Sequence, residues 1–334
     1  EKIVEVETIV EKEVIKEIRV PGETVVVEKQ IVKTVPGPER VKIVEVLAQR
    51  YVKDVWGDVV DKPQYGGTIP MATGGLHNDD QFAPYFSSAD TWAQLVMEKL
   101  GELNWVLDRN EFPMSTTYED INYYTGEIAE GWVVSDDLLT ITMDIRDGIY
   151  WHDNGGPVNG RGLTAKDVEY TFEKNHGLGE FAEVGPSPYF HGSMPVLSSA
   201  TALSDYQMEF KLNEKSLNSL RLILGGSPST QGVSLIVARE VTDEYGDMKD
   251  WLKVVGTGPY MITEFVVGSS LTLSSNANYW MDDPVYPDLK NRLPYADQVI
   301  YYVIPERATR VAALRTGKSA FEPGLPTDQI MQLK

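Results

Sequence analysis

The chain contains no cysteine among its 334 residues, which excludes a disulfide framework, a thiolate metal site and a thiol nucleophile. Histidine is scarce, and the four residues at positions 77, 152, 176 and 191 include no pair at the spacing of a zinc or facial-triad site. Basic residues number 30 against 50 acidic ones, and the net charge of −20 disfavours nucleic acid and anionic lipid as partners. We therefore expect no metal, no cofactor and no nucleic-acid partner.

No apolar run reaches the ~18 residues that a membrane-spanning helix needs. The sequence begins at Glu1 without a methionine, a signal peptide or a lipid-accepting cysteine, as a processed or trimmed product would.

The composition is that of a folded protein. Hydrophobic residues make up 42% and aromatic residues 10% of the chain, which is too rich for a solvated polymer. At roughly 150 residues per domain, the length indicates about two domains.

Residues 1–46 differ sharply from the remainder. Nineteen of them are Val or Ile, most others are Glu or Lys, and aromatic residues, Ala, Leu and Met are absent. The β-branched composition favours strands over a coiled coil. We interpret this segment as a β-rich stalk, followed by a linker over residues 47–63.

Two Pro-Gly steps, Pro21-Gly22 and Pro36-Gly37, divide the stalk, and EKEVIK at 11–16 is repeated imperfectly as EKQIVK at 28–33. Either the stalk is a mobile spacer between a membrane anchor and the body, or it is a self-associating β element. Its strand edges can be paired by another copy of the chain, by a neighbouring body, or by its own repeat folded back at the Pro-Gly steps. We favour pairing between chains.

From about Gln64 the pattern becomes that of a mixed α/β body. Apolar and polar residues alternate over 139–145, which predicts a half-buried strand. Thr164 followed by Asp167 forms a capping-box pattern and predicts a helix whose Val168 and Phe172 face the core. Further strands are predicted over 270–274 and 298–304, and a helix over 308–316, ended by Gly317.

Catalytic signatures are weak. The acidic doublets at 136–137 and 282–283 lie in turns, where neighbouring carboxylates point apart. The doublet at 79–80 lies in a glycine-containing loop after the first strand of the body, where it either is solvated or faces a ligand. GTGPY at 256–260 is followed by a strand pattern without Lys-Ser/Thr, which excludes a nucleotide-binding loop, and there is no GxSxG elbow. We expect a protein that is not an enzyme.

Five landmarks in order carry a resemblance: YGGTI at 65–69, AEGWVVSDDLLTITMDIRDGIYWHD at 129–153, LTAKDVEYTFEK at 163–174, VVGTGPYMITEFVVGSSLTLSSNANYW at 254–280 and LPYADQVIYYVIPERATRVAALRTG at 293–317. Together they resemble the peptide, dipeptide and nickel class of extracellular solute-binding proteins, family 5, which are the ligand receptors of ABC importers. The resemblance covers residues 64–334.

The resemblance implies a periplasmic-binding-protein-like lobe over residues 64–334, made of a domain I and a domain II inserted in it, with the second lobe largely absent. It implies that the chain stops near the crossover to that lobe. Two departures stand out: DNGGPVNGRGLTAKDV at 153–168 carries an insertion, and KSAF at 318–321 replaces the usual Glu and Asp.

Transferred to this sequence, the resemblance places ligand-binding candidates in a glycine-rich loop and on aromatic side chains. Backbone amides and aromatic faces hold an extended peptide with little demand on its sequence. The candidates are Thr73, Gly74, Gly75, Leu76, Asp79, Phe82, Tyr260, Tyr279 and Trp280.

The function that follows is a receptor for an oligopeptide or a similar small polar solute, which acts without catalysis and hands its ligand to an ABC transporter permease. We expect it outside the cell or in a periplasm, anchored to the membrane upstream of Glu1. The alternative is a structural surface or filament subunit that assembles through residues 1–46.

Overall fold

The computed structural model describes residues 17–20, 23–26, 50–76, 92–108, 110, 112, 120–186, 196–216, 218–225, 235–246, 248–322, 325 and 330. The chain divides into two compact units, which are described separately: Glu1–Gln64 with Asp282–Asn291, and Tyr65–Met281 with Arg292–Lys334. The sequence does not predict that the ten residues from Asp282 belong with the first unit.

The first unit contains two strand pairs. β1 (Glu17–Val20) and β2 (Glu23–Val26) pair antiparallel on either side of the Pro21-Gly22 step. This is the folded-back arrangement, so the favoured pairing between chains is not what these two strands show. The other residues of the 1–46 segment lie outside the described residues.

The second hairpin of this unit joins β3 (Tyr51–Lys53) to β4 (Val59–Asp61). The carboxylate of Asp54 accepts the backbone N–H groups of Trp56 at 3.0 Å and Asp58 at 2.9 Å, which fixes the turn. The backbone N–H of Val55 donates to the carbonyl of Val285, which ties the segment from Asp282 to this hairpin.

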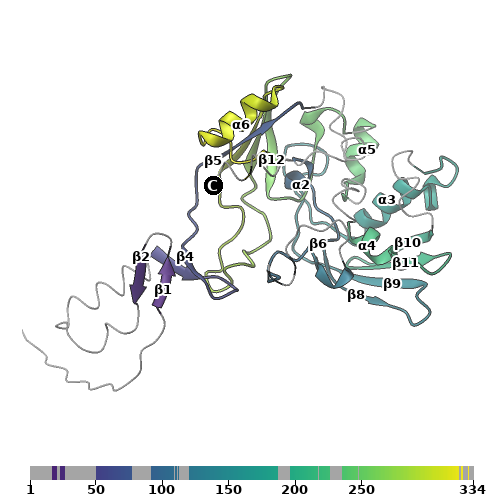
Figure 1. Ribbon diagram of the computed structural model, residues 1–334. Helices are drawn as coiled ribbons and strands as arrows, with labels where there is room; N and C mark the ends of the chain where they lie inside the picture. The colour runs from purple at the N-terminus through teal and green to yellow at the C-terminus, as the bar shows by residue number, and fades with distance from the viewer. Residues whose placement is uncertain are drawn as a thin grey trace, which may run out of the picture. The chain divides into compact units, whose positions relative to one another are not determined.

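The second unit contains a four-stranded mixed sheet in the order β12-β13-β14-β5 (Figure 1). Its first strand in the chain, β5, pairs parallel with β14, with Thr68 opposite Gln298 and Thr73 opposite Val303. The other neighbours are antiparallel. The strands are β5 (Thr68–Thr73), β12 (Tyr260–Val266), β13 (Ser270–Ser275) and β14 (Gln298–Val303).

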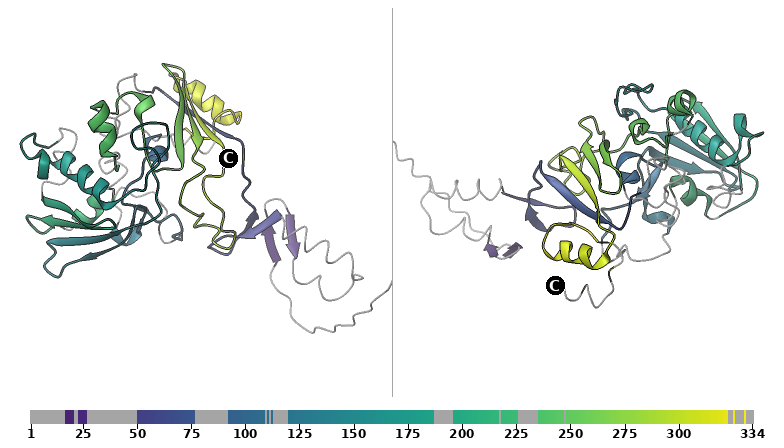
Figure 2. Two further views of the ribbon diagram at one scale, coloured as in Figure 1. Left: turned by 180° about the vertical axis from the view of Figure 1, so that it is seen from behind. Right: turned by 90° about the horizontal axis from the view of Figure 1, so that it is seen from above.

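A second four-stranded sheet, in the order β10-β11-β9-β8, is antiparallel throughout. Helix α3 (Ala165–His176) packs on β10 and β11, as Figures 1 and 2 show, and Phe172 meets Phe210 edge to face at 4.9 Å. The strands are β8 (Ala129–Val134), β9 (Thr140–Ile145), β10 (Leu197–Ser204) and β11 (Gln207–Leu212).

Short elements complete this unit. They are α2 (Ala93–Val96), α4 (Ser219–Leu224), α5 (Arg239–Tyr245), α6 (Arg307–Arg315), the 3-10 turns η1 (Ile121–Tyr123), η2 (Gly179–Phe181) and η4 (Trp251–Lys253), and the strand pair β6 (Gly101–Leu103) and β7 (Tyr124–Gly126). No helix within the described ranges is long and apolar enough to cross a membrane.

The predicted local elements of the body are confirmed. β9 buries Ile141, Met143 and Ile145, and Asp167 accepts the backbone N–H of Thr164 at 2.9 Å, as in a capping box. The predicted strands at 270–274 and 298–304 are β13 and β14, and the helix over 308–316 is α6. The mixed α/β class is confirmed with them.

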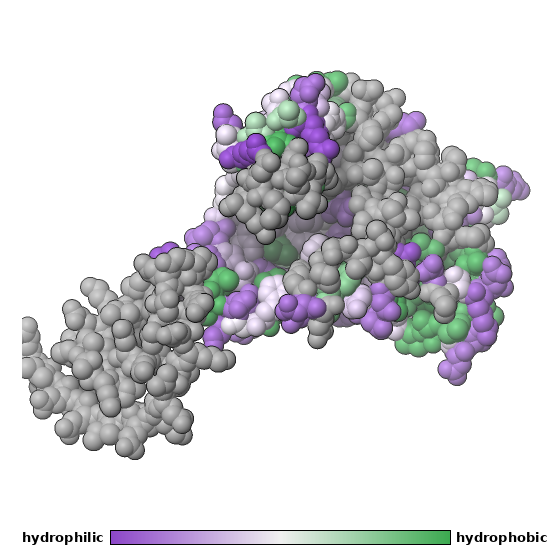
Figure 3. All heavy atoms as spheres, in the orientation of Figure 1, coloured by the Kyte–Doolittle hydropathy of each residue, from purple (hydrophilic) through white to green (hydrophobic). Residues whose placement is uncertain are grey.

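Strand β8 lies at the edge of its sheet and carries exposed apolar side chains. Val133 is 70% exposed and Val134 is also exposed, and Leu138 is exposed in the turn between β8 and β9. Apolar surface gathers in this part of the molecule in Figure 3, at the lower right. An edge strand with exposed valines is open to pairing with another strand.

Candidate functional site

The predicted loop follows directly from the carboxyl end of β5, beside the carboxyl end of β14. The backbone N–H of Ile304 donates to the carbonyl of Thr73 at 2.8 Å, and the Thr73 hydroxyl donates to the carbonyl of Gly75 at 2.9 Å. Gly74 and Gly75 are exposed, while Thr73 and Leu76 are partly buried. Ligands of open α/β sheets bind outside the carboxyl ends of parallel strands, and the loop occupies such a position.

Arg310 of α6 supports this loop. Its guanidinium donates to the carbonyls of Ile304 and Pro305, and a Cβ on Gly74 would lie 3.2 Å from Arg310 Nη1. A side chain at position 74 would therefore press on the guanidinium. The close approach explains why glycine suits this position.

A buried ion pair holds Arg310 in place. Its Nε lies 2.9 Å from a carboxylate oxygen of Glu322, whose side chain is 1% exposed. The chain before Glu322 runs along β5, where the backbone N–H of Ala72 donates to the Ser319 hydroxyl and that of Ala320 donates to the carbonyl of Pro70. α6, β5 and the segment 319–322 thus form one support beneath the loop.

Two of the loop candidates, Asp79 and Phe82, lie outside the described residues. The structure therefore brings together four of the six loop candidates at one strand end.

The aromatic candidates Tyr279 and Trp280 converge on a buried carboxylate. Glu98, which is 1% exposed, accepts the Tyr279 hydroxyl at 3.0 Å and the Trp280 indole N–H at 2.9 Å. Tyr279 is buried, whereas Trp280 is partly exposed and has the Arg146 guanidinium 4.6 Å from its ring centroid. Of these two rings, the Trp280 ring is the more exposed, and the Arg146 guanidinium lies over one of its faces.

Glu98 belongs to a group of three acids with unusual electrostatics. Burial raises the pKa of Glu98 to about 7, against opposing hydrogen bonds from Thr257, Trp280 and Tyr279. Burial also raises the pKa of Glu102 and that of Glu127, and the neighbouring carboxylates add to the effect at Glu127. No group of acids or histidines in the described part of the chain has the arrangement of a metal site.

Tyr260 lies inside the body. It is 5% exposed at the start of β12, and its hydroxyl donates to the carbonyl of Ala296 at 3.2 Å. Burial raises the pKa of this phenol to about 12. Its aromatic ring therefore packs in the core of the sheet.

The GTGPY loop before β12 is a packing feature. A Cβ on Gly256 would collide with the carbonyl oxygen of Val96, so no side chain fits there. The buried His152 ring accepts the Gly256 N–H at Nδ1 and contacts the Gly258 carbonyl through Nε2 at 2.9 Å. Burial lowers the pKa of His152 to about 4.

Sequence reasoning missed Glu98, Arg310 and Glu322. Glu98 follows an apolar run, and Arg310 lies in a short helix, but neither position carries a local signal for burial or pairing. Their partners come from distant parts of the chain.

The family model of bacterial extracellular solute-binding proteins, family 5 (middle region), matches residues 124–334. Di/tripeptide-binding protein 1 of Pseudomonas aeruginosa is 26% identical over 199 residues, which are 57% of this chain and 34% of that protein. The dipeptide-binding protein of Escherichia coli is 24% identical over 233 residues, 65% of this chain and 40% of that protein. The chain thus spans well under half the length of these relatives.

Solved structures with a similar fold agree with the family match. The periplasmic binding protein DppA of Helicobacter pylori, in complex with the peptide STSA, aligns with a TM-score of 0.60 at 24% identity, over 80% of this chain and 49% of that one. HbpA2 of Haemophilus parasuis aligns with a TM-score of 0.59 at 19% identity and the same coverage. At these identities the likeness shows the fold, which confirms the periplasmic-binding-protein-like architecture.

Members of the matched family bind solutes outside the cytoplasm and are not enzymes. The match extends over more than half of the chain, and it includes β8 to β14 and α6, with the residues that support the candidate loop. This protein belongs to the bacterial extracellular solute-binding proteins of family 5.

Proposed function

We propose that this chain forms the first lobe of an extracellular or periplasmic receptor that binds an oligopeptide or a similar small polar solute and delivers it to the permease of an ABC importer. Membrane anchoring upstream of Glu1 is part of the proposal. A relative named for di- and tripeptide binding, a second named for dipeptide binding and a structural neighbour solved with a peptide support the ligand class.

The observation that carries the proposal is the exposed Gly74-Gly75 pair at the carboxyl end of β5, held from behind by Arg310. Exposed glycine amides let the backbone of a peptide approach closely. The proposed contact face consists of Thr73, Gly74, Gly75 and Leu76, with Asp79 and Phe82 as further candidates. Tyr260, Tyr279 and Trp280 belong to the opposite end of the sheet, where Tyr260 pairs with Ser275, and Ser274 lies opposite Gln298 at the start of β14. They are therefore not part of the proposed contact face.

The test uses two glycines that differ in position. A Cβ would meet nothing within 4 Å at Gly75 or at Gly131, so valine fits at both. Saturation-transfer NMR with the tripeptide Ala-Ala-Ala should show contact with the wild type and with Gly131→Val, and little or none with Gly75→Val. Absence of tripeptide contact with the wild type, or equal contact in both variants, would count against the proposal.

Affinity gives a second readout. A single wall leaves most of a ligand in water with few polar groups converging on it, so we expect binding weaker than micromolar. Micromolar binding of Ala-Ala-Ala by this chain in a calorimetric titration would show that the described lobe already holds a complete site.

A structural role is the second candidate, and the β1–β2 pair favours it. A two-stranded ribbon is marginally stable alone, so a partner along either outer edge would stabilise it. Light scattering of the whole chain and of a chain lacking residues 1–46 tests this role. The structural role is supported if the whole chain assembles and the shortened chain stays monomeric. It is refuted if both chains are monomeric.

A further inference from the structure

The second unit contains a cavity of about 690 Å³ that the candidate loop does not line. Its wall comes from two chain segments, one between β9 and α3 and the other between β13 and β14. The lining residues are Gly148, Tyr150, Trp151, Asp153, Asn159, Gly160, Ala277, Asn278, Tyr279 and Arg292. This volume lies within the roughly 300–1,000 Å³ that is usual for small-molecule sites.

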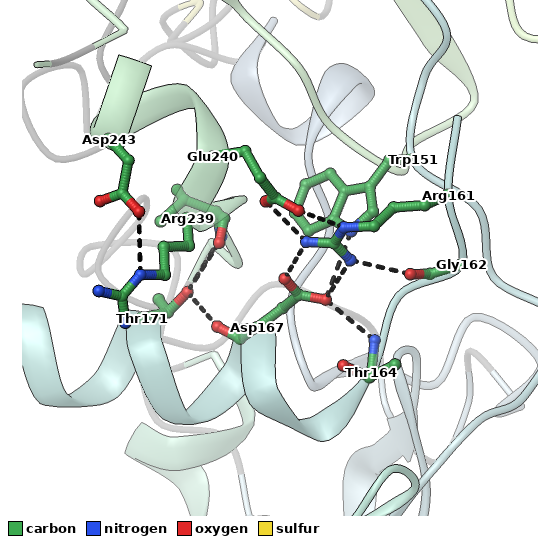
Figure 4. Close-up of polar contacts among 10 residues, drawn as sticks. Trp151, Arg161, Gly162, Thr164, Asp167, Thr171, Arg239, Glu240 and Asp243 are labelled. Carbon is green, nitrogen blue, oxygen red and sulfur yellow. Dashed lines mark hydrogen bonds and ion pairs between the residues drawn. The ribbon is translucent and has the colours of Figure 1, made fainter. Parts of the chain in front are cut away.

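The floor of the cavity is rigid. Trp151 is 2% exposed, its indole N–H points to the Asp167 carboxylate at 3.4 Å, and the Arg161 guanidinium lies 5.8 Å from its ring centroid. Figure 4 shows Arg161 between Asp167 and Glu240, bonded to both carboxylates. Tyr279, the second buried ring, is held by Glu98. A site with such a floor loses little conformational freedom on binding.

The rim of the cavity is polar and exposed. It carries the carboxylate of Asp153, the amides of Asn159 and Asn278, and the guanidinium of Arg292, with the Tyr150 ring 51% exposed beside them. The Nη1 group of Arg292 donates hydrogen bonds to the carbonyls of Tyr279 and Trp280, which holds the guanidinium against the floor. Four planar polar groups and one open aromatic face thus surround one volume.

The charges of this lining select the ligand class. The negative charge of Asp153 and the positive charge of Arg292 cancel, so the lining has no net charge that would attract an anion or a cation. The protein's net charge of −20 also repels anions at long range. A polar rim disfavours a purely apolar ligand, because its groups would lose water without compensation. Planar amide, carboxylate and guanidinium groups bind neighbouring hydroxyls in pairs, and an aromatic ring packs on the apolar face of a sugar.

We propose that this cavity is a second ligand site, which binds a neutral, hydroxyl-rich small molecule of the saccharide class. Asp153, Asn159 and Gly160 come from one segment, which connects β9 to α3. Asn159 and Gly160 both adopt positive φ, 50° and 65°, and they lie in a turn of this segment. The segment between β9 and α3 therefore builds one wall of the site.

Saturation-transfer NMR with maltose, cellobiose, trehalose and chitobiose, each at millimolar concentration, tests the proposal on the whole chain. At least one disaccharide should give signals. Ala277→Trp fills the cavity and should weaken its binding about tenfold or more, as should Tyr150→Ala, which removes the exposed ring. Tyr302→Ala is the matched control, because Tyr302 is 43% exposed on β14 and lies outside the cavity lining.

Three results would overturn the proposal. They are the absence of signals from all four disaccharides, binding that Ala277→Trp and Tyr150→Ala leave unchanged, and binding of the zwitterion Ala-Ala in the cavity in place of a sugar. Thermal melts of the variants separate loss of binding from loss of fold, and Tyr150→Ala, at an exposed position, should melt like the wild type.

Discussion

Replacing Glu98 by glutamine tests the electrostatics behind the aromatic pair. The amide of the Glu98→Gln variant keeps an oxygen that can accept the Tyr279 hydroxyl and the Trp280 indole N–H, but it carries no ionisable group. In the native protein, burial raises the pKa of Glu98 from 4.5 to about 7. The substitution therefore removes the cost of a buried charge while keeping the shape.

The sign and size of the effect follow from linkage. Between pH 4.5 and about 7 the folded state binds more protons at Glu98 than the unfolded state, so the stabilisation present at low pH is lost as the pH rises. A shift of this size corresponds to about 3 kcal/mol at 1.36 kcal/mol per pKa unit. Glu98→Gln should thus be more stable than the wild type by about 3 kcal/mol at pH 8 and nearly equal to it at pH 4.5.

Urea denaturation followed by tryptophan fluorescence measures this difference, since Trp280 contacts Glu98 directly. The comparison of variant and wild type at each pH cancels the titration of other carboxylates. Glu183→Gln, at an exposed position, is the control and should show no pH-dependent gain. A difference between Glu98→Gln and the wild type that does not grow between pH 4.5 and pH 8 would refute the reasoning.

Three further predictions concern stability and association. Arg310→Met leaves the Glu322 carboxylate buried beside α6 and should lower the free energy of unfolding by about 3 kcal/mol, measured by urea denaturation; a loss below about 1 kcal/mol would show that the pair adds little. Asp167→Ala removes the cap of α3 together with both bonds to Arg161 and should cost about 3 kcal/mol by the same assay, whereas Lys166→Ala, on the exposed side of the same turn, should cost under about 1 kcal/mol. Val133→Lys places a charge on the edge strand β8 and should reduce light scattering on heating, while Thr142→Lys on β9 should not; equal scattering would exclude the β8 edge as the point of association.

The sequence predicted those parts of the fold that depend on neighbouring residues. The alternation over 139–145 and the pair Thr164 and Asp167 act within one strand or one helical turn, so β9 and α3 followed from the pattern. Pro21-Gly22 likewise indicated a chain reversal. Whether a strand pairs within its own chain or with another chain depends on which strand edge binds it more strongly. Amino-acid composition does not determine that difference.

The candidate site was predicted only in part, for a related reason. Gly74 and Gly75 were found through the family resemblance, but the Arg310 support depends on α6 meeting the end of β5. Tyr279 was expected at a ligand face, and its burial against Glu98 joins residues 181 positions apart. Such contacts are set by the packing of whole elements, which periodicity does not encode.

The parallel pairing of β5 with β14 has a consequence for synthesis on the ribosome. Gly67 and Asp297, at the start of this pair, are joined by a hydrogen bond across 230 residues. The sheet of β8 to β11 can form as soon as its own strands emerge from the ribosome. In contrast, β5 cannot pair until its partner β14 has been translated, near the end of the unit. Long-range pairings of this kind form slowly and leave strand edges exposed meanwhile. The nascent chain should therefore depend on chaperone protection of β5 far longer than of the second sheet.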